Sequence, residues 1–468
     1  MSAEASHCGG VVLAAGLGTR FRSDQAKVMH RIGGRTLLRH VLEALRPLGL
    51  SQVVVVVGHQ WEEVAADAMS AGLPGLATVL QAQQLGTGHA AAQALRALDE
   101  AVERVLILPG DTPLLTAATL ERLLAAGAQA SAALLTVQFD DPTGYGRILR
   151  DEAGRVLGVV EEADATEHQR SLREANAGMY LFERGCLADA LGRLAPVNAQ
   201  GELYLTDVVG ILVGDGREVE AVSTAAEEVS GVNDRVQLAA AGAMLRDRTL
   251  ERLMRDGVTV LDPATTYVDV DVSVGRDSIL LPGCLLEGRT RVGQRVTLGP
   301  YTRLVDAEVQ DGATVAQSVV ISASVGPDAS VGPFTYLRPG TRLERGAKAG
   351  GFVEMKNATI GEGSKVPHLS YVGDARLGRG VNFSAGAITC NYDGFRKHET
   401  IIEDDAFVGS DNMLVAPVRI GRGAFTAAGS VITKDVPDDA LALERNEQRT
   451  IEGWAARKRE QRQQGRGE

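Results

Sequence analysis

The sequence predicts two folds in one chain, an α/β Rossmann-like domain followed by a left-handed parallel β-helix of hexapeptide repeats. Up to about residue 234, short apolar runs alternate with longer helical patterns. A stretch rich in helix formers follows, and beyond it aliphatic residues recur at every sixth position. A chain of 468 residues also exceeds what one core usually serves. We therefore assign an α/β domain to 1–234, a connecting helix to 235–257, and a β-helix with a helix-like tail to 258–468.

The α/β prediction rests on the order of elements in the first half. Strand-like apolar runs occupy 10–15, 53–57 and 105–108, and helical patterns occupy 37–45, 61–69 and 89–101. Strands separated by helices are typical of βαβ units on a parallel sheet. Ligands on such sheets bind at the carboxyl ends of the strands, so we expect the site of this domain there.

The β-helix prediction rests on a six-residue period, which neither a helix nor a simple strand has. The aliphatic residues in phase, many followed by glycine, are Val268, Val274, Leu280, Leu286, Val292, Leu298, Leu304, Val325, Val331, Leu337, Leu343, Ile360, Val366, Val372, Val408, Leu414, Ile420 and Ile432. Each unit would form one side of a triangular coil, and stacked coils bury each other's faces. An irregular β-sandwich is the alternative. The period breaks near Gly346–Glu354 and Cys390–Thr400, where we expect inserted loops that carry function.

Composition limits the partners and the compartment. The formal net charge of −12 argues against binding to nucleic acid or to a membrane surface. No apolar stretch approaches the ~20 residues of a membrane span, so membrane insertion is not expected. The four cysteines lie far apart without C-x-x-C spacing, which fits a reducing, cytoplasmic location.

A glycine-rich turn, Leu13–Arg20, follows the first predicted strand. Backbone N–H groups in such a turn can bind phosphate, and Arg20 and Lys27 add cationic charge. The turn matches neither G-x-G-x-x-G nor the P-loop, so a purely structural turn is the alternative. Asp111 ends the apolar run 106–110, where a carboxylate can hold Mg²⁺. A capping role is the other interpretation of Asp111.

Seven motifs in order carry a resemblance to a known family: LAAGLGTRF, AKVMH, QAQQLGTGHA, GDTPLL, PTGYGRI, GELYLTD and VSGVNDR. The first half resembles bacterial N-acetylglucosamine-1-phosphate uridyltransferases, which carry a nucleotidyltransferase domain. The second half resembles the glucosamine-1-phosphate acetyltransferase half of the same bifunctional enzymes. The resemblance spans nearly the whole chain and implies Mg²⁺ as cofactor, with UTP and acetyl-CoA as co-substrates.

The resemblance implies a role for each matching residue of the first half. The residues implied to bind UTP or UDP-N-acetylglucosamine are Leu13, Ala14, Ala15, Gly16, Arg20, Lys27, Gln81, Gly86, Thr87, Pro109, Gly110, Asp111, Gly144, Glu161, Asn176 and Asn233. Among them, Gln81, Gly86 and Thr87 would contact the uracil. Gly144, Glu161 and Asn176 would contact the sugar, and Asp111 and Asn233 would hold Mg²⁺. The chain departs from the family at Leu17, Ala163 and Ala177, which puts some phosphate and sugar contacts in doubt.

His368 is the candidate base of the second half. An amine that attacks a thioester must lose a proton, and a neutral imidazole suits that task. A lone histidine is more often structural, but the family places its base at this position. The resemblance assigns glucosamine 1-phosphate to Arg338, Lys356, Tyr371 and Asn382, where solvated corner residues are the alternative for the two cations. It assigns acetyl-CoA to Ala385, Asn391, Tyr392, Ser410, Ala428 and Arg445.

The implied reactions form a sequence, because the product of acetyl transfer, N-acetylglucosamine 1-phosphate, is the acceptor for the uridylyl group. Hexapeptide acyltransferases generally associate as trimers, so the resemblance implies a homotrimer through the β-helix. One alternative is a sugar nucleotidyltransferase whose β-helix is only regulatory or oligomerising, as in ADP-glucose pyrophosphorylases. Another is a scaffold with a degenerate nucleotide-binding head.

Overall fold

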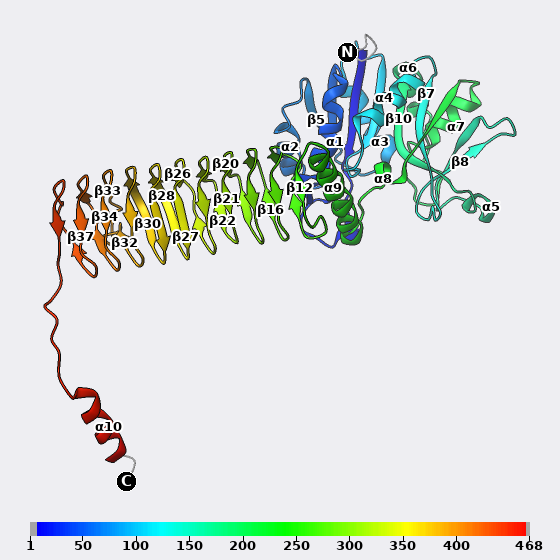
Figure 1. Cartoon of the computed structure of the whole chain (residues 1–468). Coiled ribbons are helices and arrows are strands. Elements are labelled where there is room, and N and C mark those ends of the chain that lie inside the picture. The colour runs from blue at the N-terminus through cyan, green and yellow to red at the C-terminus, as the bar shows by residue number, and fades with distance from the viewer. Residues whose placement is uncertain (1–6, 465–468) are drawn as a thin grey trace. The chain divides into compact units, whose positions relative to one another are not determined.

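The computed structural model describes residues 7–464, which form two compact units that divide between Thr249 and Leu250. In the first unit, a mixed sheet is covered by helices (Figure 1). Its strands are β1 (Cys8–Ala14), β4 (Gln52–Val57), β5 (Leu76–Leu80), β6 (Arg104–Pro109), β7 (Ala132–Gln138), β8 (Arg147–Arg150), β9 (Val156–Val160), β10 (Glu174–Glu183) and β11 (Val219–Thr224). The main path runs β11-β7-β10-β6-β1-β4-β5, with β8 and β9 attached beside β10.

The remaining elements of the first unit connect and cover the sheet. Its α-helices are α1 (Leu37–Leu45), α2 (Trp61–Met69), α3 (Thr87–Ala97), α4 (Ala117–Ala126), α5 (Glu167–Arg170), α6 (Arg184–Gly192), α7 (Asp207–Gly214) and α8 (Ala226–Val229). Short 3₁₀ turns are η2 (Thr19–Phe21), η3 (Lys27–Met29) and η4 (Arg46–Leu48), and β2 (Arg31–Ile32) pairs with β3 (Arg35–Thr36).

The sheet is buried on both faces, because neighbouring residues of one strand pack into different cores. Val11 of β1 belongs to one buried cluster, and Val12 belongs to the other. Such two-sided burial is why the strands read as apolar runs. The expected parallel arrangement holds for β1, β4, β5 and β6, but β10 is antiparallel to both β6 and β7. The parallel pairing expected of the βαβ units therefore does not extend to β10.

Helix α9 (Arg235–Arg255) contains the division between the two units. Ala241 packs in a cluster of the first unit, whereas Leu250 and Leu253 pack in the core of the second. The helix ends before Gly257, whose φ of +94° an L-residue rarely adopts. Over residues 7–464, no helix is long and apolar enough to cross a membrane.

The second unit is a left-handed parallel β-helix, as the period predicted (Figure 1). One face consists of β12 (Thr259–Val260), β15 (Ile279–Leu280), β18 (Thr297–Leu298), β21 (Thr314–Val315), β24 (Ser330–Val331), β27 (Lys348–Gly351), β29 (Lys365–His368), β31 (Asn382–Phe383), β34 (Phe407–Val408), β37 (Phe425–Thr426) and β39 (Leu441–Ala442). We call it the first face.

The other two faces are joined in one continuous pairing path. The second face holds β13 (Tyr267–Val268), β16 (Leu285–Glu287), β19 (Arg303–Val305), β22 (Val319–Ile321), β25 (Tyr336–Leu337), β32 (Ile388–Cys390), β35 (Met413–Val415) and β38 (Val431–Ile432). The third holds β14 (Ser273–Val274), β17 (Arg291–Val292), β20 (Glu308–Val309), β23 (Ser324–Val325), β26 (Arg342–Leu343), β33 (Thr400–Ile402) and β36 (Val418–Ile420). Two longer strands, β28 (Glu354–Ile360) and β30 (Tyr371–Leu377), bend through the corner between these faces.

The interior of the prism is aliphatic, and its sequence explains the irregularities of the period. The in-phase residues are buried in one continuous cluster, apart from the partly buried Val274. Some sides are one residue shorter than six, as from Leu304 to Val309, which shifts the phase. The expected loop at Gly346–Glu354 is wrong, because β27 continues the stack and the buried Ala349 takes the interior position opposite Val331.

The second expected insertion is present. Tyr392 bridges Lys397 in an antiparallel pair, so Cys390–Thr400 forms a small hairpin between coils. After it the stack resumes, with Arg376 paired to Ile401. The tail contains α10 (Trp454–Gln464), whose described side chains are exposed. Residues 465–468 of the predicted tail and 1–6 of the predicted first domain lie outside the described residues.

Candidate active sites

A cavity of about 550 Å³ opens at the carboxyl ends of β1 and β6 in the first unit. Most residues that the resemblance assigned to the nucleotide sugar line it: Leu13, Ala14, Ala15, Gly16, Lys27, Gln81, Gly86, Thr87, Pro109, Asp111, Glu161 and Asn176. These residues come from separate strands and loops, so the sheet order brings them together. The cavity is where an α/β sheet is expected to bind its ligand.

Tight packing shapes the glycine-rich turn. Gly18 has a φ of +62°, and a Cβ there would approach Lys27 Cβ to 2.7 Å. A side chain at residue 18 would therefore displace Lys27 from the turn. By contrast, a Cβ at Gly16 would meet nothing within 4 Å, which leaves that backbone open to the cavity. Leu17, one of the departures from the family, is 57% exposed and also lines the cavity.

Two cationic side chains meet a carboxylate and an amide oxygen at one end of the cavity. Lys27 Nζ donates to Asn233 Oδ1 at 2.9 Å and forms an ion pair with the Asp111 carboxylate. Arg20 Nη2 donates to the same Asn233 oxygen at 3.1 Å. The backbone N–H of Val232 donates to Asp111 O at 2.9 Å, which fixes the 231–233 loop beside the end of β6. Asn233 thus lies beside Asp111, although the residue pattern around it gave no signal.

Another part of the cavity lining is formed by the residues expected to contact the uracil. Gln81 Nε2 donates to Gly86 O at 3.1 Å and lies 3.0 Å from His89 Nδ1. Thr87 Oγ1 accepts a hydrogen bond from Leu205 N at 3.0 Å. Gly86 has a φ of +104°, and a Cβ there would come within 2.6 Å of Leu203 O. These contacts hold the segment rigidly at the start of α3.

The partly buried Glu161 and the buried Asn176 form a polar wall beside Thr206 and Tyr180. Thr206 Oγ1 donates to Glu161 Oε1 at 2.9 Å, and Asn176 Nδ2 donates to the Tyr180 hydroxyl at 2.6 Å. Burial raises the pKa of the Glu161 carboxyl, and the nearby Asp207 and Asp164 raise it further. The register of β10 against β7 shifts between Asn176 and Tyr180. Such an irregularity can re-aim a side chain.

Four assigned residues do not line the cavity. Arg20 and Asn233 belong to the charged cluster beside it. Gly110 lies under the turn, where its N–H donates to Leu13 O at 2.9 Å. Gly144 lies in the loop before β8, where a Cβ would meet nothing within 4 Å.

The cavity also includes residues that residue-level reasoning missed. Thr206 and Tyr180 contribute the hydroxyl groups of its polar wall. The GELYLTD motif contains Thr206 and was the available signal, whereas Tyr180 lies inside an apolar strand. Of the two other departures, Ala163 is exposed and Ala177 is buried in the core.

His368 belongs to a column of equivalent positions at one edge of the prism. Successive coils are joined by hydrogen bonds from Gly386 N to His368 O (3.3 Å), Asp411 N to Ala385 O (2.9 Å) and Gly429 N to Ser410 O (2.8 Å). Arg445 Nη1 reaches Ala428 O at 3.0 Å. We call this column of His368, Ala385, Ser410 and Ala428 the histidine edge. In this edge the imidazole of His368 is followed by the small residues Ala385, Ser410 and Ala428.

Lys356 lies at a different edge, where cations gather. Arg338 precedes it by one coil, with Arg338 N donating to Met355 O at 2.8 Å, and Arg338 pairs with Glu354 at 2.8 Å. The nearby Lys397 ammonium lowers the pKa of Lys356, with Arg338 adding to the effect. We call Arg338, Lys356 and Lys397 the cationic edge. It is suited to an anionic group.

The hairpin insertion is fastened beside the cationic edge. Asn391 Nδ2 donates to Asp374 Oδ2 at 2.5 Å, and Asn357 Nδ2 donates to Asp374 Oδ1 at 2.8 Å. Tyr392 donates its hydroxyl proton to Gly394 O at 2.6 Å within the hairpin. Tyr371 lies on the second face, between the two edges. Asn382 lies on the first face, where its Nδ2 donates to Ser384 Oγ at 3.0 Å.

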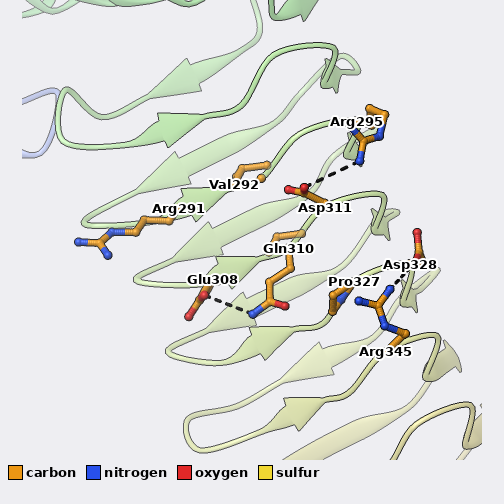
Figure 2. Close-up of a pocket in the computed structure, with 11 residues that line it drawn as sticks. Arg291, Val292, Arg295, Glu308, Gln310, Asp311, Pro327, Asp328 and Arg345 are labelled. Carbon is orange, nitrogen blue, oxygen red and sulfur yellow. Dashed lines mark hydrogen bonds and ion pairs between the residues drawn. The ribbon is translucent and has the colours of Figure 1, made fainter.

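Another hollow, of about 560 Å³, lies on the β-helix away from both edges (Figure 2). None of the assigned residues lines it. Arg345 pairs with Asp328 at 3.0 Å, and Arg295 lies 3.8 Å from Asp311. Because its cations are largely matched by carboxylates, we do not assign a catalytic role to it.

Comparison with known proteins identifies the family. A family model described as a MobA-like NTP transferase domain matches residues 10–179. Proteins named bifunctional protein GlmU match almost the whole chain. The relative from Thermobifida fusca is 54% identical, covering 96% of this chain and 94% of its own. Those from Streptomyces avermitilis and Heliobacterium modesticaldum are 52% and 49% identical, each over 96% of this chain and over 94% and 98% of their own.

The chain belongs to the GlmU family. This confirms the family inferred from the motifs and the assignment of the chain as a bifunctional transferase. The NTP transferase match includes the glycine-rich turn and Asp111, which line the cavity of the first unit. Because the GlmU relatives match 96% of this chain, the similarity covers the β-helix as well as the first unit.

Proposed function

We propose that the chain makes UDP-N-acetylglucosamine in two steps at two sites. The β-helix transfers an acetyl group from acetyl-CoA to the amine of glucosamine 1-phosphate. The first unit then joins the product to UTP and releases pyrophosphate. The observation that carries the proposal is identity of about half of all residues with bifunctional relatives across both units.

In the uridylyl step, a phosphate oxygen of N-acetylglucosamine 1-phosphate attacks the α-phosphorus of UTP in line. The new P–O bond forms as the bond to the pyrophosphate group breaks. Little covalent chemistry is required of the protein, so positioning and charge stabilisation supply the rate. Arg20 and Lys27 would face the triphosphate, since both are cations at the rim of the glycine-rich turn.

The donor set at Asp111 and Asn233 fits Mg²⁺. Both side chains present oxygen to one cation, the Lys27 ammonium, so their oxygens converge on a single position. Mg²⁺ prefers oxygen ligands and commonly takes one or two from protein, with phosphates and water completing the shell. When bound, the ion would neutralise charge on the transferred phosphate. Lys27 would then turn its ammonium towards the phosphates.

In the acetyl step, His368 takes a proton from the amine as nitrogen attacks the thioester carbon. The C–N bond forms, the C–S bond breaks, and CoA leaves as the thiol after protonation. The small residues stacked at the histidine edge would suit a bound cofactor, and the cationic edge would suit the sugar phosphate.

We propose further that the acetyl site is completed between copies of the chain in a homotrimer. His368 and Lys356 lie at different edges of one prism, separated by the face that bears Tyr371. A neighbouring prism would bring one copy's cationic edge to the other's histidine edge. The four cysteines carry free thiols, in keeping with a reducing cytoplasm as the proposed location.

A coupled assay tests both steps. The full chain is given glucosamine 1-phosphate, acetyl-CoA, UTP and Mg²⁺, and the expected product is UDP-N-acetylglucosamine with equimolar free thiol and pyrophosphate. Leaving out acetyl-CoA should stop both products, and supplying N-acetylglucosamine 1-phosphate should restore pyrophosphate alone. Pyrophosphate release without any thiol release under full conditions would refute the acetyltransferase half.

A further inference from the structure

Arg147 is a buried arginine in the first unit that the proposed mechanism does not use. It lies in β8 and is 2% exposed. Burying an arginine is costly unless its charge and its donors are satisfied. The groups that bond to the Arg147 guanidinium therefore indicate its structural role.

Every partner of the Arg147 guanidinium lies in a segment beside the polar wall of the cavity. Nε donates to Leu172 O at 3.0 Å, and Nη2 donates to Arg170 O at 3.3 Å and forms an ion pair with Glu162 Oε2 at 2.8 Å. Nη1 donates to Tyr145 O. One side chain thus joins the loop before β8, the segment after β9, and the segment that leads into β10.

These segments carry the three residues proposed to contact the sugar. Glu161 is the neighbour of Glu162, and Gly144 is the neighbour of Tyr145. Asn176 lies one residue beyond Ala175, which pairs with Arg147, and Asn176 N donates to Gly146 O at 2.8 Å. None of the Arg147 bonds reaches the glycine-rich turn, Lys27 or Asp111.

We propose that Arg147 is the positioning residue of the sugar subsite, holding Gly144, Glu161 and Asn176 in one geometry. This inference rests on the proposed function, because it takes the sugar contacts from it. A planar guanidinium can bond several carbonyls and a carboxylate at once, whereas a lysine ammonium is a single point charge on a flexible stem. The role therefore needs arginine and not merely a positive charge.

The test is steady-state uridylyl transfer by the full chain with Arg147→Gln and Arg147→Lys. Each substrate is varied while the other is saturating. Misplacement of substrate-positioning groups by about 1 Å can cost on the order of a hundredfold in rate. We expect the KM for N-acetylglucosamine 1-phosphate to rise about tenfold or more in Arg147→Gln, with the KM for UTP within about twofold. Arg147→Lys should lie between Arg147→Gln and the unchanged chain.

Two further variants calibrate the result. Arg150→Gln is the matched control, because Arg150 lies in the same strand but pairs with the partly exposed Glu174 at 2.6 Å. It should leave both KM values unchanged. Glu161→Gln is the benchmark for direct sugar contact and should raise only the acceptor KM. Acetyl transfer and thermal unfolding are measured on every variant to report folding.

The outcomes separate the inference from the function on which it rests. An effect of Glu161→Gln without an effect of Arg147→Gln would overturn the positioning role and leave the proposed function standing. No effect of Glu161→Gln would instead overturn the proposed sugar site. An equal rise of both KM values in folded Arg147→Gln would also contradict the inference. If Arg147→Gln does not fold, Arg147→Lys and Glu162→Gln decide, and an unchanged acceptor KM in both overturns it.

Discussion

The two units gather their site residues in opposite ways. In the first unit, residues far apart in the chain, such as Lys27, Asp111 and Asn233, come within bonding distance. In the β-helix, residues close in the chain, such as Lys356 and His368, fall on different edges of the prism. A doubly covered sheet concentrates the ends of its strands at one place. A solenoid instead spreads neighbouring residues around its coil, which is why the acetyl site is proposed to be completed by another copy of the chain.

The largest expected effect separates the two activities. His368→Ala should lower acetyl transfer by about 10²–10⁴-fold, because the attacking amine loses its general base, and should spare uridylyl transfer. Asp111→Ala should do the reverse, because its oxygen converges with that of Asn233 on one cation position. Thiol release and pyrophosphate release measure the two reactions separately. A folded variant that lost both activities would contradict the separation of the sites.

A second prediction concerns pH in the cavity. Burial raises the pKa of Glu161, so its carboxylate is present above that raised pKa and is lost as pH falls through it. If the carboxylate contacts the sugar, the KM for N-acetylglucosamine 1-phosphate should rise on the acid side. The rise should begin at a higher pH than an ordinary glutamate would give. Glu161→Gln should remove this pH dependence, and a profile unchanged by the substitution would assign it to another group.

A third prediction concerns the prism interior. Leu337 is fully buried between coils, so Leu337→Ala should destabilise the chain by about 2–5 kcal/mol through lost burial and a cavity. Because each coil contacts only its neighbours, acetyl transfer should fall at lower denaturant concentration than uridylyl transfer. Loss of both activities at one midpoint would show that the two units unfold together.

The smallest expected effect is at the surface. Arg376 pairs with Glu399 at 2.6 Å beside the hairpin insertion, and both side chains are largely exposed. Exposed pairs contribute about 0–1 kcal/mol, so Arg376→Gln should shift the unfolding midpoint little. If acetyl transfer fell without a loss of stability, the ion pair would instead be needed to hold the hairpin in position.

Some residues of the candidate sites could be proposed from local patterns in the sequence. The turn Leu13–Arg20 was identified as a glycine-rich segment after a predicted strand. Asp111 was identified as a carboxylate at the end of another apolar run. Asn233 was assigned by the resemblance alone, because it lies in an ordinary turn, and Tyr180 was missed, because it lies in an apolar strand. Their positions depend on strand order and on the shift in β10, neither of which leaves a local signal.

The sequence by itself determined the two folds, because an alternation of strands and helices and a six-residue period each admit few packings. It also determined much of the interior of the prism, but not the positions after a shortened side, such as Val309, or the small interior residue Ala349. Only the tertiary structure decided the antiparallel direction of β10, the meeting of Asn233 with Lys27, and the approach of Lys397 to Lys356. These features depend on contacts between segments that are far apart in the chain. A short-range sequence pattern does not show which distant segments meet.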